Sequence, residues 1–149
     1  MSLYLFACLI LIIAPICTLI HELGHACGAK LAKADRIKLN LGIGKGHWTI
    51  AMNNLELTLR SIYFIGGVTE SEREIPYKKS EIIWITFFGP MFNGVAATII
   101  YIIYEVNPNS LLQLLFWFNV WMAVVNMIPF KIKGKQTDGF AILRLICRE

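Results

Sequence analysis

The sequence has few charged residues. Of its 149 residues 16% are charged and 56% are hydrophobic, whereas about 25% of the residues in a typical soluble domain are charged. So little charge cannot cover a water-facing surface, which excludes an ordinary cytosolic enzyme, and so apolar a chain is not a disordered tail. The four cysteines form no CxxC pair, and disulfide bonds are not expected in or beside membrane segments.

The apolar residues are concentrated in three blocks, at 3–20, 82–104 and 111–130. At 1.5 Å per residue, each block is long enough to cross a hydrocarbon core of about 30 Å. No basic residue precedes the first block, and no small-residue cleavage site follows it, so we expect a mature span rather than a signal peptide. The sequence predicts an α-helical membrane protein with three transmembrane helices, at about 3–26, 81–104 and 111–129.

Cations are absent from the loop between the second and third blocks. All 14 Lys and Arg residues lie between residues 27 and 80 or after residue 130. The positive-inside rule therefore predicts a cytoplasmic 27–80 segment and C-terminus, and an external N-terminus. Acidic residues interrupt the cations, which favours a surface at the lipid headgroups over nucleic-acid binding.

Residues 37–68 have the pattern of strands. Apolar residues alternate with polar or small ones on both sides of Asn53-Asn54, which is a turn signal. A two-stranded ribbon is too small to stand alone, so we expect a small membrane-associated β-ribbon on the membrane surface. Residues 69–80, which contain Pro76, are expected to form a polar linker.

The sequence His21-Glu22-Leu23-Gly24-His25 matches the pattern H-E-x-x-H. On a helix, His21 and His25 share one face and can hold one zinc ion, and Glu22 lies about 100° away, within reach of water at the metal. A carboxylate near the membrane centre costs about 2.5–3.5 kcal/mol, so its presence directly after an apolar block favours a function. The competing interpretation is a helix end that surfaces at the headgroups.

A catalytic zinc site needs a third ligand, for which the sequence offers His47 or Asp138. Asp138 is the stronger candidate, because the predicted topology places it on the same side of the membrane as His21 and His25. Asp138 is also expected to cap a final helix over residues 139–147, a role that is compatible with metal binding. Cys17 shares the helical face of His21, but a small packed side chain is the usual role of such a cysteine.

Prolines interrupt the second and third apolar blocks. Pro90 frees the carbonyl of Thr86 and is followed one turn later by Asn93; Pro129 follows Asn126. These positions are either kinks with interhelical hydrogen bonds or openings that line a polar cavity.

Taken together, the motifs resemble the site-2 protease family of intramembrane zinc metalloproteases. The resemblance rests on H-E-x-x-H at 21–25, Ile65-Gly66-Gly67-Val68, Gly89-Pro90 with Asn93, and Asn126 with Pro129 before Asp138-Gly139. It implies one Zn²⁺ per chain on His21, His25 and Asp138, Glu22 as the catalytic base, and Asn93 holding substrate or the oxyanion. The eight residues between Pro129 and Asp138 exceed the family's usual spacing, and 131–135 are expected to form a basic loop.

The resemblance predicts a zinc metalloendopeptidase that cleaves a peptide bond in or near a transmembrane segment of a membrane protein or peptide precursor. We expect one unit over residues 1–149, in the lipid bilayer of a prokaryotic plasma membrane, with its active site towards the cytoplasm and no nucleic-acid partner. An exposed edge of the ribbon would capture the unwound substrate by strand addition. The alternative is a non-catalytic zinc-binding membrane scaffold or chaperone, against which the intact Glu22 argues.

Overall fold

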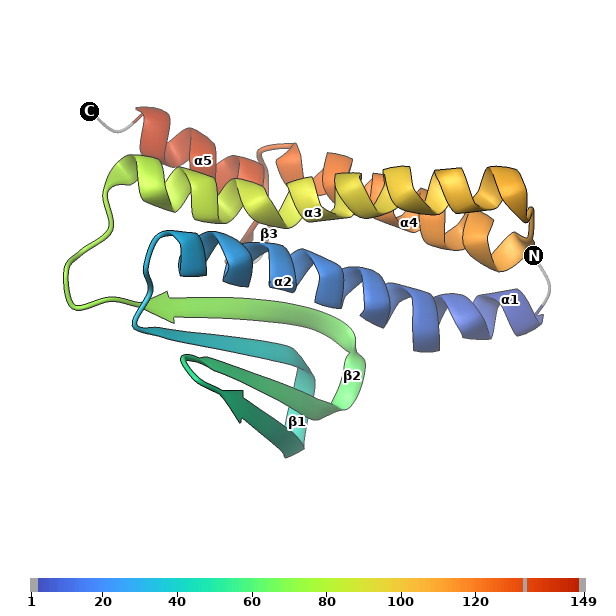
Figure 1. Cartoon of the computed structure of the whole chain (residues 1–149), viewed down its shortest axis with the longest axis horizontal. Coiled ribbons are helices and arrows are strands. Elements are labelled where there is room, and N and C mark those ends of the chain that lie inside the picture. The colour runs from blue at the N-terminus through green and yellow to red at the C-terminus, as the bar shows by residue number, and fades with distance from the viewer. Residues whose placement is uncertain (1–2, 133, 148–149) are drawn as a thin grey trace.

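Three long helices lie side by side, with a β-ribbon along one of them (Figure 1). The computed structural model describes residues 3–132 and 134–147. The first long helix consists of α1 (Leu3–Cys8), a π-helical turn (Leu9–Ile13) and α2 (Ala14–Leu31). The other elements are β1 (Arg36–Met52), β2 (Leu55–Glu72), α3 (Lys79–Val106), α4 (Ser110–Met127), β3 (Lys131–Ile132), β4 (Lys135–Gln136) and α5 (Asp138–Cys147).

The three long helices have the dimensions and surface of membrane spans. The segments Leu3–Leu31, Lys79–Val106 and Ser110–Met127 are long and apolar enough to cross a bilayer, yet their most apolar stretches are only 22%, 22% and 6% buried within the protein. Outward-facing side chains such as Ile102 and Trp117 are exposed. Apolar helices with exposed apolar faces are stable in lipid rather than in water, which agrees with the predicted membrane protein.

The π-helical turn in the first span follows from Pro15. Proline has no N–H to donate to the carbonyl four residues earlier, which is that of Leu11. The backbone N–H of Ala14 bonds instead to the carbonyl of Leu9, five residues back. The hydroxyl of Tyr63 in β2 donates to the Leu11 carbonyl over 3.2 Å. The proline thus leaves a carbonyl oxygen that accepts one hydrogen bond from the ribbon.

The third span is shorter than predicted. Its first turn is capped by Asn109, whose side chain accepts from the N–H of Leu112. The helix ends at Met127, because the residue before a proline disfavours the helical conformation and Ile128 precedes Pro129. The prediction that Pro129 interrupts a helix is therefore wrong. Pro90, by contrast, does lie inside α3.

The ribbon is more folded than a simple hairpin. β1 and β2 are antiparallel around the predicted turn at Asn53 and Asn54, with Met52 opposite Leu55. Both strands bend, so that Leu39 lies between two segments of β2 and pairs with Leu57 on one side and Thr69 on the other. β2 continues to Glu72, so residues 69–72 are strand and not linker. Their polar side chains suggested a linker, but ladder hydrogen bonds come from the backbone and do not require apolar side chains.

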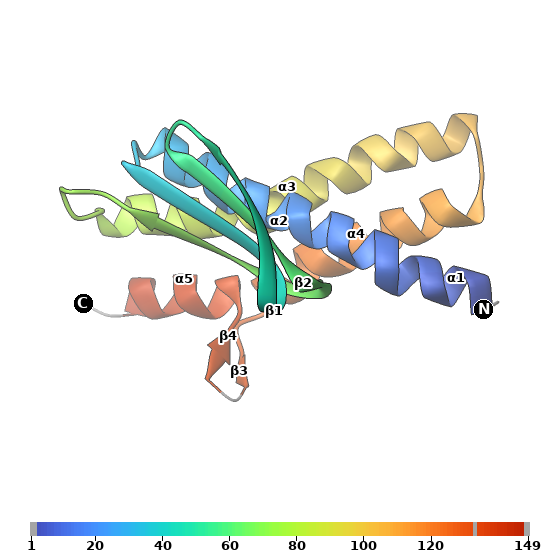
Figure 2. The ribbon, with the colours of Figure 1, turned by 90° about the horizontal axis from the view of Figure 1, so that it is seen from below.

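The ribbon lies alongside α2 rather than beyond its end (Figures 1 and 2). Ile37 and Leu39 are buried against Ala26 and Ala29, and each such side chain contributes about 1.5–3 kcal/mol by leaving water. The small residues of α2 let the strand approach closely. The ribbon reaches back along the helix as far as Leu11.

Arg73 fastens the end of the ribbon to the helices. Its guanidinium donates to the carbonyl of Ala32 over 2.6 Å and to the carboxylate of Glu81 over 2.8 Å. The hydrogen bond to Glu81 raises the pKa of Arg73 above its ordinary value. The same contacts join the end of α2 to the start of α3, so β2 is held in a fixed position beside α2.

Candidate metal centre

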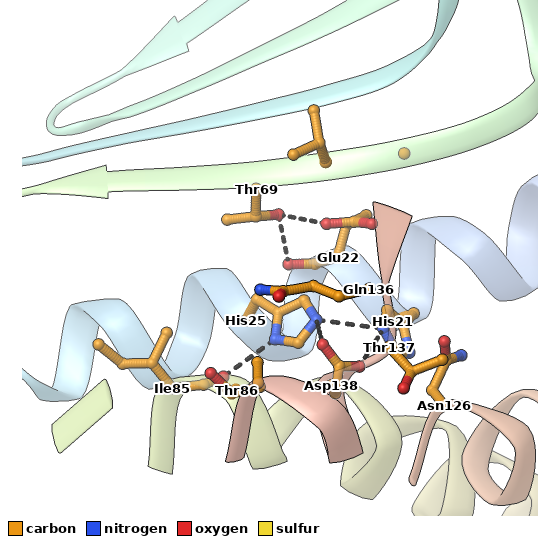
Figure 3. A pocket seen from close by; sticks show the side chains of 13 residues that line it. His21, Glu22, His25, Thr69, Ile85, Thr86, Asn126, Gln136, Thr137 and Asp138 are labelled. Atoms are coloured by element: carbon orange, nitrogen blue, oxygen red, sulfur yellow. Dashed lines mark hydrogen bonds and ion pairs between the residues drawn. The ribbon is translucent and has the colours of Figure 1, made fainter. Parts of the chain in front are cut away.

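His21 and His25 face each other on one side of α2. Their Nε2 atoms are 3.1 Å apart, and the two rings are almost perpendicular, at 87°. Asp138, at the start of α5, brings its carboxylate to the same point (Figure 3). Its Oδ2 is 3.0 Å from Nε2 of His21, and its Oδ1 is 3.5 Å from Nε2 of His25. The structure therefore brings together the three predicted ligands, and among its described residues they form the one such group.

Thr137 and Gly139 place Asp138 at this point. The hydroxyl of Thr137 donates to the carbonyl of Ile128 over 2.7 Å and accepts from the N–H of Phe140. This caps α5 and ties its first turn to the end of α4. At Gly139 a side chain would collide with the carbonyl of Met127. The cap is therefore Thr137 and not Asp138, so the expectation that Asp138 also caps this helix is wrong.

Both histidines have their Nδ1 atoms occupied by acceptors. Nδ1 of His25 is 2.9 Å from the carbonyl oxygen of Ile85, and Nδ1 of His21 is 2.8 Å from Oδ1 of Asn93. An oxygen that only accepts requires a proton on the nitrogen, so Nδ1 carries the hydrogen in each neutral ring. The lone pairs of both Nε2 atoms therefore point at the carboxylate of Asp138.

The donor set fits a zinc ion. In the described part of the chain, Oδ2 of Asp138 is buried without a hydrogen-bond partner, and two nitrogen lone pairs converge on the same point. Ligand atoms that surround a tetrahedral zinc at about 2.0–2.1 Å lie about 3.3 Å from one another, and the distances here are 3.0–3.5 Å. Two histidines and one carboxylate are a ligand set that leaves the fourth position open, as in catalytic rather than structural zinc sites.

Gly89 of α3 provides the space for the two imidazoles. A Cβ atom at this position would lie 2.5 Å from Nε2 of His25 and 3.0 Å from Cε1 of His21. The glycine next to Pro90 thus has a steric role at the site, beyond the loosening of the helix that the sequence suggested.

Glu22 lies in the same cavity as the three candidate ligands. The cavity has a volume of about 430 Å³ and is lined by residues of α2, β2, α3, α4, β4 and α5 and by Thr137. Oε2 of Glu22 accepts a hydrogen bond of 2.7 Å from the hydroxyl of Thr69, and a Cβ on Gly67 would lie 2.7 Å from Cγ of Glu22. β2 therefore fixes the position of the carboxylate within the cavity that the three candidate ligands line.

The comparison with known families decides the identity. The sequence profile of peptidase family M50 matches residues 7–109. The chain belongs to peptidase family M50, the site-2 protease family. Members of this family are zinc-dependent proteases that act within membranes. A search of curated proteins found no match.

The M50 match covers His21, Glu22, His25 and Asn93 but ends before Asp138. The assignment of Asp138 therefore depends on the structure, which brings it to the histidines of the matched region. The match confirms the resemblance to site-2 proteases that the motifs indicated.

Three other residues considered from the sequence do not line the cavity that holds the candidate ligands. Asn93 is fully buried behind His21 and does not line the cavity. His47 is exposed on β1, where it pairs with Arg60 and is bonded to a backbone carbonyl. Cys17 is buried, and its sulfur accepts a hydrogen bond from Asn119. Because Asn93 lies behind His21 and not in the cavity, its position does not support the expected contact with substrate or the oxyanion.

Thr69 and Asn119 were not recognised from the sequence. Thr69 lay in the segment predicted to be a linker, although the neighbouring Gly66-Gly67 pair was a signal that this part of the chain approaches the site. Asn119 lies in the middle of an apolar block. The signal that could have identified Asn119 is that a lone polar residue in a membrane span usually faces the other helices.

Proposed function

We propose that this chain is a zinc-dependent intramembrane endopeptidase that hydrolyses a peptide bond in or near a transmembrane segment of a membrane protein or peptide precursor. The observation that supports it is the convergence of His21, His25 and Asp138 in one cavity with Glu22, among helices long enough to span a bilayer. A structural zinc site is normally closed by four protein ligands. Three ligands with a carboxylate beside them are the composition of a hydrolytic site.

His21 and His25 through Nε2, and Asp138 through its carboxylate, would hold one zinc ion per chain. Bound there, zinc would polarise the scissile carbonyl and lower the pKa of water. Glu22 takes the proton of the attacking water and delivers it to the nitrogen of the leaving amine. Since Oε2 is bonded to Thr69, we assign Oε1 as the oxygen that carries this proton.

The edge of β2 beside the cavity is suited to hold an extended substrate. In the described residues, Gly67, Val68 and Thr69 pair with β1 on one side and line the catalytic cavity on the other. A transmembrane helix must unwind before its carbonyls can react, because helical hydrogen bonds occupy them. An unwound segment that pairs with this edge regains backbone hydrogen bonds and presents a carbonyl to Glu22.

We propose that Asn126 and Gln136 contact the polar backbone of the substrate, because both residues line the cavity. The Nδ2 of Asn126 is bonded to the carbonyl of Met122 in its own helix, so its oxygen would make this contact. Asn93 was expected to hold the substrate or the oxyanion. Its carboxamide is instead bonded to His21, Cys17 and Asn119. We therefore replace that expectation with a role for Asn93 behind His21, argued in the next subsection.

We propose that the N-terminus is external and that the active site opens towards the cytoplasm, in the plasma membrane of a prokaryote. The end of α2, the start of α3 and α5 lie at one end of the molecule, and the turn between α3 and α4 lies at the other (Figure 1). The first end carries cations such as Lys30, Lys79 and Arg144, and the turn carries none. This distribution supports the orientation by the positive-inside rule.

The substitution Glu22→Gln tests hydrolysis. Glutamine keeps the size of the side chain and can still bond to Thr69, but it cannot accept a proton. Zinc content should remain about one per chain, while cleavage of a single-span membrane protein in liposomes falls by at least about 10²-fold. A zinc chelator should abolish cleavage by the wild type.

Thr98→Val is the matched control. Among the described residues, the hydroxyl of Thr98 is bonded within α3, to the carbonyl of Gly94, so this variant should cleave normally. Cleavage by Glu22→Gln at the wild-type rate would refute the mechanism. Zinc binding without cleavage of any substrate in a broad panel would support the scaffold instead.

A further inference from the structure

A chain of buried carboxamides runs behind His21. Asn93 of α3 and Asn119 of α4 are both 0% exposed. Nδ2 of Asn93 donates to Oδ1 of Asn119 over 2.9 Å, and Oδ1 of Asn93 is 2.8 Å from Nδ1 of His21. The chain therefore links the three spanning helices and ends at a candidate metal ligand.

The orientation of Asn119 is determined by fixed partners. Its Nδ2 lies 2.8 Å from the carbonyl oxygen of Leu115 and 3.1 Å from the sulfur of Cys17. A backbone carbonyl only accepts, so the NH₂ group must face it. The oxygen of Asn119 is then the atom presented to Asn93.

Asn119 in turn determines the orientation of Asn93. An oxygen presented by Asn119 requires the NH₂ group of Asn93 to face it, and the carbonyl of Cys17, 3.0 Å away, requires the same. The oxygen of Asn93 is left facing His21. Because this oxygen accepts, Nδ1 of His21 carries the proton and its Nε2 lone pair faces Asp138.

We propose that Asn119 is a positioning residue for the metal centre, which acts through Asn93 to hold His21 in the tautomer and orientation that bind zinc. The proposal rests on the metal site put forward above and not on the hydrolytic step. Neither asparagine contacts the cavity, so neither is a catalytic residue. Partners of this kind behind a metal-binding histidine typically change metal affinity by about 10–100-fold.

A structural role as an interhelical hydrogen bond is the competing explanation, and a double-mutant cycle separates the two. In Asn93→Asp both terminal atoms of the side chain are oxygens, so either can accept from His21 and no orientation remains to be set. Asn119→Leu should weaken zinc binding about 10–100-fold in the wild-type background and have almost no effect in the Asn93→Asp background. The unfolding temperature of the four metal-free proteins is measured in the same cycle, because a purely structural contribution of the Asn93–Asn119 hydrogen bond would appear there and not in the zinc affinity of the folded protein.

The experiment measures zinc affinity by competition with a chelating indicator, using full-length protein in detergent. Thr98→Val, which removes a hydroxyl of α3 that is bonded within its own helix, should leave the affinity unchanged. The absorption spectrum of the Co²⁺-loaded protein should change in Asn119→Leu and return in the double variant. The spectrum reports the geometry of the ligands around the metal. If Asn119→Leu only weakened helix packing, the second substitution would not restore the wild-type spectrum.

Equal loss of affinity in both backgrounds, or no loss in either, would overturn the proposal. If Asn119→Leu does not fold, the tautomer of His21 in the metal-free wild type gives the answer by ¹⁵N NMR: a proton on Nδ1 supports the proposal and a proton on Nε2 overturns it. A wild-type protein that binds no zinc would overturn the metal site itself, a result distinct from failure of the cycle.

Discussion

Replacement of Gly89 by alanine is expected to remove zinc while leaving the helices in place. The new Cβ would lie 2.5 Å from Nε2 of His25, about 1 Å closer than an ordinary contact of about 3.5 Å. Either the ring or α3 must therefore move by about 1 Å. Zinc ligands tolerate changes of about 0.2 Å, so the affinity should fall by at least about 10²-fold, more than the loss of a partner behind the ligand.

Gly94→Ala is the matched control on the same helix. No described atom lies within 4 Å of a Cβ placed at Gly94, so alanine there should stabilise α3 by up to about 1 kcal/mol through helix propensity. The same local gain applies at Gly89, but overpacking opposes it by about 1–3 kcal/mol. The two variants therefore separate the effect on the helix from the effect on the metal.

The assay combines zinc titration with thermal unfolding of purified protein in detergent, with and without added zinc. Zinc should raise the unfolding temperature of the wild type and of Gly94→Ala, since a ligand that binds the folded state stabilises it. It should not raise that of Gly89→Ala. If Gly89→Ala bound zinc as tightly as the wild type, the assigned position of the ion between His21, His25 and Asp138 would be wrong.

Two further predictions concern the base and the topology. Thr69→Val should lower kcat by about 10–100-fold with zinc affinity unchanged, because a hydrogen bond to a charged group contributes about 1.5–3 kcal/mol. Turnover at the wild-type rate would contradict the placement of Glu22 by β2. Thr98→Val serves as the control. A reporter fused after residue 149 should score cytoplasmic and one inserted at 107–109 external; the opposite result would refute the charge argument.

The parts of the structure encoded by neighbouring residues could be predicted from the sequence. Apolar blocks indicate spans because their length is matched to the bilayer, and His21 and His25 share a face because they are four residues apart on a helix. The turn at Asn53-Asn54 is equally local and was found in its predicted place. Asp138 was also predicted as the third ligand, although that prediction depended on a topological argument rather than on spacing.

The parts that depend on distant partners could not be predicted in this way. The consequence of Pro15 involves Tyr63, which is far from it in the sequence. Asn119 is one polar residue in an apolar block, and its partners come from two other helices. Thr69 follows from the register of β2 against β1, and a register between bent strands is set by packing rather than by alternation alone.

The division of the metal ligands between α2 and α5 also sets the order in which the site is made. During synthesis His21, Glu22 and His25 enter the membrane with the first helix, whereas Asp138 follows only after α3 and α4. Two histidines without the carboxylate form an incomplete zinc site, so the proposed protease is inactive while its own later spans are still being inserted. If the proposed activity is correct, cleavage would become possible only after α5 has joined the two histidines of α2.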